Sequence, residues 1–190
     1  MKVVKIGGVI AAIGKPISQN LVPRGHLEKV QGCNWARNQL RFLVQKHLLR
    51  QDVLLTGPPS PVKQEIVMAF CEMMNFELEI VSLNRDISES DLKQRRELDS
   101  NGNLRFVDMP PLSAAINGRV LFLDGIEKAE RNVLPALNNL LENREMSLAD
   151  GRKLVSPNVF LSGLVFKLFR YQRVFSNKRL IRQTRFLRDC

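Results

Sequence analysis

The sequence predicts an α/β fold built on a parallel β-sheet, and three observations predict it. Short apolar runs typical of strands alternate with segments whose apolar residues recur at helical spacing, the pattern of a sheet with right-handed crossovers. Residues 120–124 (VLFLD) form a nearly continuous apolar run, as strands buried in a parallel sheet do. Residues 53–56 (VLLT) form a similar run that ends at Gly57.

The elements of the first half follow in order. Residues 3–6 and 9–10 are expected to form two short strands around a glycine pair, and a loop leads from them to residue 34. Residues 35–49 are predicted to form a helix after this loop. Its apolar face comprises Ala36, Leu40, Leu43, Val44 and Leu48. After the strand at 53–56, a second helix is expected, with Val62, Ile66, Ala69, Phe70 and Met73 on its apolar face.

The second half continues the alternation. Residues 76–83 are predicted to form a strand that places Phe76, Leu78, Ile80 and Ser82 on one side. Residues 84–103 are expected to be solvated, residues 104–108 to form a short strand, and Pro110 to begin a small helix. Residues 127–142 repeat the helical period, and Pro135 predicts either a helix start near Asn132 or a kink there. Residues 145–155 are predicted to form a hairpin around Asp150-Gly151.

Composition limits the classes of protein to which the chain can belong. Its 190 residues, 44% of them hydrophobic, suffice for one domain with a buried core. Three scattered cysteines without a CxxC pair argue against a disulfide framework and a zinc site. No run of 18 apolar residues exists, so no integral membrane segment is expected. The net charge of +10 is concentrated in residues 156–190, where eight Lys/Arg face one Asp.

The loop GPPSPVKQ (57–64) is the candidate nucleotide-binding loop. In the phosphate-binding loop G-x-x-x-x-G-K-[ST], glycines let backbone N–H groups reach phosphate oxygens, the lysine contacts the β- and γ-phosphates, and the hydroxyl binds magnesium. Gly57 and Lys63 match this template, whereas Val62 and Gln64 replace the second glycine and the hydroxyl. The alternative interpretation is a proline-rich turn with a surface lysine. The candidate nucleotide-binding residues are Gly57, Pro58, Pro59, Ser60, Pro61, Val62, Lys63 and Gln64.

The second motif is the strand 120–124, which ends in a carboxylate. A strand of this kind holds the magnesium ion of a P-loop NTPase, so Asp124 is the candidate Walker B aspartate and Mg²⁺ ligand, acting through the nucleotide. In ring-forming ATPases a glutamate follows and polarises the attacking water. Gly125 stands at this place, and Glu127 is the candidate catalytic residue. The alternative is a buried strand whose Asp124 caps the following helix.

Residues 121–154 (LFLDGIEKAERNVLPALNNLLENREMSLADGRKL) resemble the Walker B strand, helix and hairpin of MoxR-type AAA+ ATPases. The resemblance covers roughly residues 5–155 and is most specific over 124–151. It implies a P-loop NTPase (AAA+) core of the dynein and midasin type, with three αβα layers around the parallel sheet. It assigns the Walker A lysine to Lys63 and the Walker B aspartate to Asp124, with ATP or ADP and Mg²⁺ as ligands.

The same resemblance implies an oligomeric assembly and a cellular location. Members form homo-oligomeric rings that bind ATP between subunits, and the hairpin at 145–155 corresponds to an insert that touches clients or neighbouring subunits. It implies a longer parent with further AAA+ modules and a C-terminal von Willebrand A domain. That parent is mitochondrial; no targeting signal is visible in this chain, and the location is otherwise expected to be cytoplasmic.

The chain departs from the family pattern at residues that perform chemistry. Gly125 replaces the catalytic glutamate, Gln64 the magnesium-binding hydroxyl, and Ser60 and Val62 two loop glycines. Loss of a water-activating group costs orders of magnitude in rate, and an amide is a poor ligand for Mg²⁺. The chain also stops where sensor 1, the arginine finger and the C-terminal helical lid follow in the family. Nucleotide binding is therefore expected to be weak, and hydrolysis weak or absent.

Three parts are expected along the chain. Residues 1–34 hold the short strands and loop, residues 35–155 the AAA+ core, and residues 156–190 a basic, Phe-rich divergent tail. The tail is interpreted as the end of a truncated form whose sequence is unrelated to the family. The alternatives are an amphipathic helix on an anionic membrane and a nucleic-acid-binding arm.

Three functions are consistent with these patterns. The first is a degenerate AAA+ module, structural or regulatory within a ring ATPase. The second is an active ATPase in which Lys63, Asp124 and Glu127 suffice once partner subunits complete the site. The third is a nucleic-acid or anionic-membrane binder that acts through the tail. Outside residues 156–190, nucleic acid is not an expected partner.

Overall fold

The computed structural model describes residues 2–57, 60–131, 133–143, 145–154 and 165–170. The first half contains β1 (Val3–Ile6), β2 (Val9–Ala12), η1 (Gln19–Leu21), α1 (Leu27–Gln31), α2 (Asn34–Leu48), β3 (Val53–Gly57), α3 (Val62–Met74) and β4 (Leu78–Ser82). The second half contains α4 (Glu89–Leu92), β5 (Gln94–Leu98), β6 (Leu104–Asp108), α5 (Pro110–Asn117), β7 (Val120–Asp124), η2 (Ile126–Lys128), α6 (Leu134–Asn138), the π-helical turn η3 (Asn139–Asn143), β8 (Met146–Ser147), β9 (Lys153–Leu154) and β10 (Val165–Arg170).

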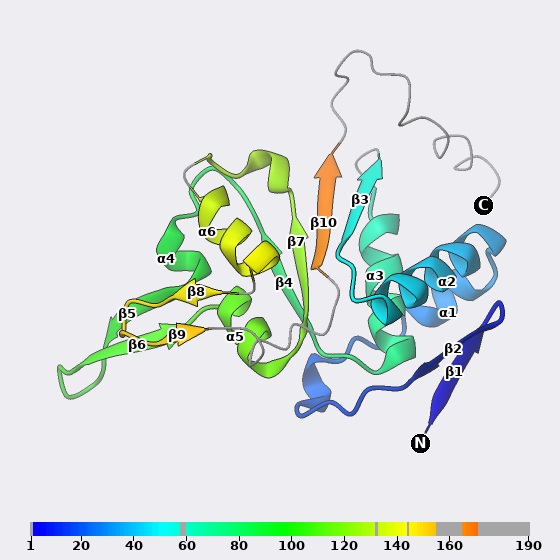
Figure 1. Ribbon diagram of the computed structural model, residues 1–190, viewed down its shortest axis with the longest axis horizontal. Coiled ribbons are helices and arrows are strands. Elements are labelled where there is room, and N and C mark those ends of the chain that lie inside the picture. The colour runs from blue at the N-terminus through cyan, green and yellow to red at the C-terminus, as the bar shows by residue number, and fades with distance from the viewer. Residues whose placement is uncertain (1, 58–59, 132, 144, 155–164, 171–190) are drawn as a thin grey trace, which may run out of the picture.

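The core of the described structure is a four-stranded sheet in the order β3-β10-β7-β4 (Figure 1). All three strand pairings are parallel, so the carboxyl ends of the strands lie at one edge. In register, Phe166 of β10 is level with Val53 of β3 and Phe122 of β7. The parallel sheet that the sequence predicts is confirmed.

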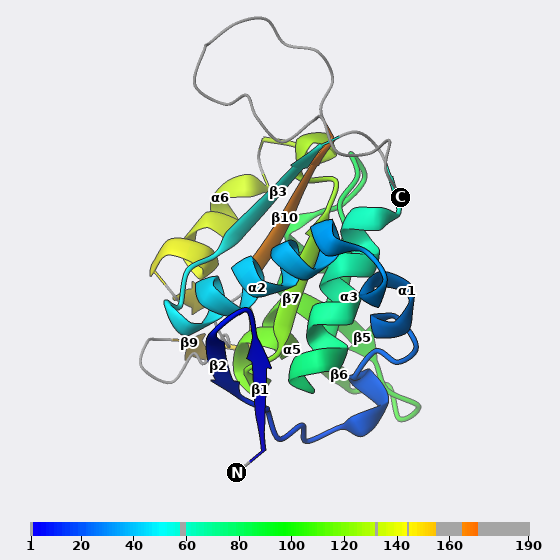
Figure 2. The same cartoon turned by 90° about the vertical axis from the view of Figure 1, so that its right-hand side faces the viewer.

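Helices cover both faces of this sheet, as Figures 1 and 2 show. The alternation of β7 explains why: Val120 and Phe122 belong to an apolar cluster with α1, α2 and α3. Leu121 and Leu123 belong to a second cluster with α4, α5 and α6. All four side chains are fully buried. The result is the three-layer αβα arrangement that the family resemblance implies.

Two hairpins extend from this body at the lower left of Figure 1. Strand β5 pairs with β6, and β8 pairs with β9, both antiparallel. The turn between β8 and β9 contains Asp150 and Gly151, and Gly151 has φ +87°, which favours glycine. The predicted hairpin at 145–155 is therefore confirmed for residues 145–154.

The largest difference from the sequence analysis concerns residues 165–170. The sequence analysis placed them in a divergent tail, whereas in the structure they form β10, between β3 and β7. The interpretation of this segment as an amphipathic membrane helix is wrong for these six residues, because they are a strand. A short apolar run between polar segments is equally compatible with a buried strand and an amphipathic helix, so periodicity alone did not distinguish them. The rest of the tail lies outside the described residues.

Smaller corrections concern elements that were predicted as uniform. Residues 94–98 form β5 although the stretch was expected to be solvated, and Gln94 is only 3% exposed. The segment 127–142 is not one helix, because it divides into η2, α6 and η3. Leu48 and Ile80 are 50% and 37% exposed, since Leu48 ends its helix and Ile80 lies on β4, an edge of the described sheet.

Candidate functional site

The candidate nucleotide-binding loop joins the carboxyl end of β3 to the first turn of α3. The Lys63 ammonium donates a hydrogen bond to the Gly57 carbonyl oxygen at 3.1 Å, so the loop brings together the two residues that match the template. The backbone N–H of Val62 donates to the Ser60 hydroxyl at 3.3 Å. Ser60, Pro61, Val62 and Gln64 are described, whereas Pro58 and Pro59 lie outside the described residues.

The amino end of α3 supplies the electrostatics of this loop. The first N–H groups of a helix have no intrahelical acceptor, and together with the helix dipole they favour an anion. Intrahelical bonding in α3 starts when the N–H of Glu65 donates to the Pro61 carbonyl at 2.9 Å. With thirteen residues, α3 is long enough for its dipole to contribute at this end.

Asp124 lies at the same edge of the sheet as the loop. It ends β7, and its carbonyl accepts a hydrogen bond from the N–H of Leu83 at 2.7 Å. Strand β10 separates β7 from β3, and its Leu168 is level with both Asp124 and Leu55. Two strand spacings place β3 and β7 about 10 Å apart. The loop and the aspartate therefore lie at the same edge of the sheet, on either side of a single strand.

Gly125 has a backbone conformation that the sequence analysis did not anticipate. Its φ of +79° lies in the left-handed region, which disfavours any side chain except that of glycine. A Cβ atom at this position would lie 3.0 Å from the Leu83 carbonyl oxygen and 3.4 Å from Cδ of Lys128. The local fold therefore favours glycine at this position, in addition to the absence of the glutamate that the family pattern places there.

Glu127 lies one turn beyond, in η2, which is adjacent to β10. Both of its carboxylate oxygens are buried, and neither has a hydrogen-bond partner among the described residues. Buried polar atoms in native proteins are nearly always satisfied, so this carboxylate is a candidate for contact with a ligand, an ion or ordered water. The sequence analysis selected Glu127 only as the nearest carboxylate, and its catalytic role stays a prediction.

Few protein ligands are available for a metal ion. Within the described ranges, no group of three or more His, Cys, Asp and Glu side chains could hold one. Mg²⁺ in nucleotide sites is commonly held by one or two carboxylates together with phosphate oxygens. The residues present fit that arrangement with Asp124 as the protein carboxylate, while Gln64 offers only an amide.

The face of α3 beside the loop binds the N-terminal segment through carboxylates. Glu65, in the first turn, contacts Nδ1 of His26 at 2.7 Å, and this hydrogen bond is the main reason why the pKa of Glu65 lies below its usual value. Further along α3, Glu72 accepts hydrogen bonds from the backbone N–H groups of Gly25, His26 and Leu27 at 2.7–2.9 Å. These contacts fix α1 beside the helix that carries Lys63.

The sequence places the chain among P-loop ATPases. Residues 52–176 match the AAA domain of the dynein-related subfamily, and the chain belongs to this family. The match extends beyond residue 155 and includes β10. The AAA+ fold and the MoxR-type resemblance are thereby confirmed.

Relatives make the assignment narrower. The chain is 47% identical over 153 residues to von Willebrand factor A domain-containing protein 8 from Mus musculus, covering 80% of this chain and 8% of that protein. It is 31% identical over 113 residues to midasin from Giardia intestinalis, covering 60% of this chain and 2% of that protein. The more specific resemblance in the sequence, to the first AAA+ module of von Willebrand factor A domain-containing protein 8, agrees with the first of these.

A solved structure supports the fold. A candidate ATPase from Cytophaga hutchinsonii superposes with a TM-score of 0.58 at 18% sequence identity, covering 76% of this chain and 41% of that chain. The chain therefore spans less than half the length of each of these two proteins and of this solved structure. Within the described residues, no helix is both long and apolar enough to cross a membrane.

Proposed function

We propose that this chain is an ATP-binding AAA+ module with degenerate Walker motifs, structural or regulatory within a ring ATPase, and with weak or absent hydrolysis of its own. The observation that carries this proposal is the position of the Lys63 loop and Asp124, at one edge of the sheet on either side of β10. ATP and ADP are the ligands, with Mg²⁺ held mainly by the phosphates.

The geometry of Gly125 supports weak hydrolysis. No carboxylate can occupy this position without straining the backbone, because φ is +79° and the Leu83 carbonyl lies 3.0 Å from the site of a Cβ. Nothing at this position can therefore polarise water. Gln64 adds to the effect, since an amide replaces the hydroxyl that binds Mg²⁺ in the template.

Calorimetric titration of the full chain with ATP and ADP, with and without Mg²⁺, tests the proposal. We expect binding that Lys63→Ala removes and that depends little on Mg²⁺. Lys46→Ala is the matched control, since Lys46 lies on α2 and bonds Gln51 instead of the loop. Absence of heat at millimolar nucleotide for the wild-type chain would contradict nucleotide binding.

A second candidate, an active ATPase completed by partner subunits, is favoured by Glu127. Its carboxylate oxygens are buried and have no partner among the described residues, and its helical turn η2 follows Asp124 and lies next to β10. Turnover by an assembled ring that Glu127→Gln abolishes, with ATP affinity retained, would support this function. Glu130→Gln, three residues further along the chain, is the control. Ring assembly and the mitochondrial location that the family resemblance implies stay predictions.

A further inference from the structure

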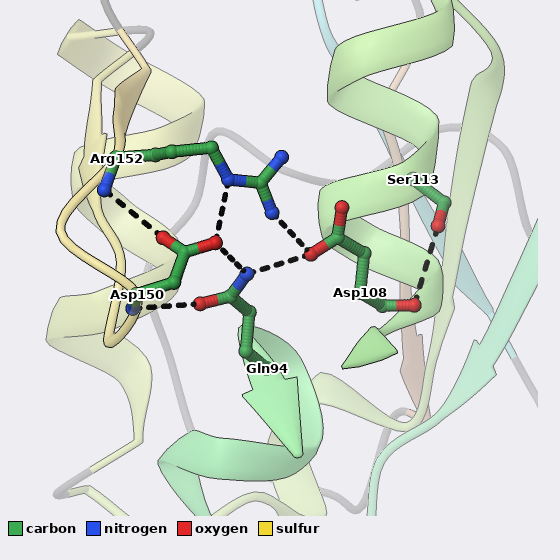
Figure 3. Close-up of polar contacts among 5 residues, drawn as sticks. All are labelled: Gln94, Asp108, Ser113, Asp150 and Arg152. Carbon is green, nitrogen blue, oxygen red and sulfur yellow. Dashed lines mark hydrogen bonds and ion pairs between the residues drawn. The ribbon is translucent and has the colours of Figure 1, made fainter. Parts of the chain in front are cut away.

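A buried glutamine connects the two hairpins. Gln94, the first residue of β5, donates from its amide nitrogen to Asp108 at 2.7 Å and to Asp150 at 2.8 Å (Figure 3). Its amide oxygen accepts a hydrogen bond from the backbone N–H of Asp150 at 3.3 Å. Both N–H donors and the carbonyl of this side chain are therefore used, and its partners come from both hairpins.

Arg152 closes the network from the side of the β8–β9 turn. Its guanidinium donates to Asp150 at 2.5 Å and to Asp108 at 2.8 Å. Each of the two aspartates thus accepts from both Gln94 and Arg152, and the four side chains form a closed ring (Figure 3). The hydrogen bond from Gln94 is the main reason why the pKa of Asp150 is lowered to about 2, so this carboxylate is ionised at neutral pH.

The β8–β9 hairpin depends on contacts from outside. Each of its strands has two residues, and an isolated two-stranded hairpin is marginally stable at best. Its apolar residues Met146 and Leu148 pack with Leu112 and Ala115 of α5 and with Leu140. This small cluster is separate from the two clusters on the sheet, and it packs the β8–β9 hairpin against α5, the helix that follows β6 directly.

A π-helical turn, η3, connects the hairpin cluster to the sheet. Leu140 belongs to the hairpin cluster, whereas its neighbour Leu141 belongs to the cluster under the sheet. Both lie in η3, and π-helical turns are rare and occur frequently at functional sites. The hairpin cluster and the sheet cluster therefore meet at this irregular turn and at α5, where Ala114 belongs to the sheet cluster and Ala115 to the hairpin cluster.

We propose that Gln94 couples the β5–β6 and β8–β9 hairpins into one rigid unit, so that each hairpin holds the other in a single arrangement. Gln94 acts as a positioning residue because a fully satisfied buried polar network fixes one arrangement and penalises others. Because the hydrogen bonds of Gln94 and Arg152 join the two hairpins directly, displacement of one hairpin is transmitted to the other.

A distance measurement tests the coupling. Spin labels are attached at exposed Asn101, in the β5–β6 turn, and Ala149, in the β8–β9 turn, through cysteine substitutions. The background is the full chain with Cys33→Ser and Cys190→Ser; Cys71 stays, because its fully buried thiol has a raised pKa. We expect one narrow distance distribution, which Gln94→Met broadens. An unchanged distribution in a folded Gln94→Met protein would overturn the coupling.

Amide hydrogen exchange gives a second, independent measurement. Gln94→Met keeps the side-chain length and removes the hydrogen bonds, so exchange at Leu148, Asp150 and Gly151 is expected to accelerate about tenfold or more. Glu97→Gln, exposed on the same strand, is the matched control and is expected to leave these amides unchanged. If Gln94→Met does not fold, Asp150→Ala removes a member of the ring that belongs to the β8–β9 hairpin. Unchanged amide exchange at Gln94 and Arg95 in Asp150→Ala would overturn the coupling.

Discussion

Gly125 illustrates how one residue is constrained twice, by sequence motif and by backbone. The motif places it where ring-forming ATPases carry a glutamate, and the structure gives it a left-handed conformation beside the Leu83 carbonyl. A glutamate at position 125 would restore the sequence motif, but it conflicts with the backbone conformation of the local fold.

Gly125→Glu is expected to lower the free energy of unfolding by about 2 kcal/mol and not to create ATPase activity. The left-handed φ and the 3.0 Å approach to the Leu83 carbonyl both contribute. Urea unfolding and a phosphate-release assay measure the two effects. Gly102→Glu is the matched control, because Gly102 has φ +78° and open space around it, so its cost is that of φ alone. Equal stabilities for the wild type and Gly125→Glu would refute the steric argument.

Glu72 makes stability depend on pH. Its burial raises its pKa, but the N–H groups of Leu27, Gly25 and His26 outweigh burial and hold the pKa below the ordinary 4.5. A lowered folded-state pKa stabilises the protein above the unfolded-state pKa, and this contribution is lost as pH falls through the folded-state value. The loss is therefore expected below about pH 4.5.

Glu72→Gln is expected to reduce the free energy of unfolding by about 1–2 kcal/mol at pH 7 and by less at pH 3. Urea unfolding at both pH values measures the difference. Glu28→Gln, on the exposed face of α1, should have little effect at either pH. If the deficit of Glu72→Gln were the same at pH 3 and pH 7, ionisation of Glu72 would not be its cause.

At the scale of elements, a buried ion-pair network joins the amino ends of β4 and β7. Arg119, just before β7, donates to Glu77 at 2.5 Å and to Glu79 at 2.7 Å. Glu77 also accepts the backbone N–H of Ser18, which attaches the N-terminal segment to this end of the sheet. Three segments distant in the sequence therefore meet at the carboxylate of Glu77.

Arg119→Met is expected to cost about 3 kcal/mol of unfolding free energy, because it leaves the carboxylate of Glu77, only 6% exposed, without its cation. Arg95→Met removes a pair between the exposed Arg95 and Asp91 and should cost much less, because solvent screens exposed ion pairs. Denaturant unfolding of both variants gives the comparison. A smaller loss for Arg119→Met than for Arg95→Met would contradict the role of burial.

The β5–β6 element shows the limit of local patterns. Residues 94–98 (QRREL) are almost entirely polar, and β-propensity gave no reason to expect a strand. Pairing with Leu104–Asp108 and the hydrogen bonds of Gln94 stabilise it instead. A buried glutamine in a charged stretch has no signature in the sequence, because its partner Asp150 lies 56 residues away.

At the scale of the whole molecule, β10 joins the sheet. Among the described strands, β3 pairs only with β10, and β10 pairs with β7. In the described part of the sheet, the strand that bears the candidate loop is therefore paired to the Asp124 strand by way of residues 165–170.

A chain ending at residue 155 is expected to lose cooperative thermal unfolding, whereas a chain ending at residue 176, the limit of the family match, should keep it. Without β10, the backbone groups of β3 and one side of β7 lose their partners. Calorimetry of both chains measures the difference. Equal melting transitions for the two chains would mean that β10 contributes nothing to the fold.

The sequence by itself determined the α/β class and the positions of most strands and helices, because burial leaves a period of two or 3.6 residues in local sequence. It also gave the residues of the candidate site, because a phosphate-binding loop and a strand-end carboxylate are local motifs. The strand order, the insertion of β10, the left-handed Gly125 and the Gln94 ring were decided only by the tertiary structure. Each of these depends on pairing between residues far apart in the chain, and such pairing leaves no periodic trace in a single sequence.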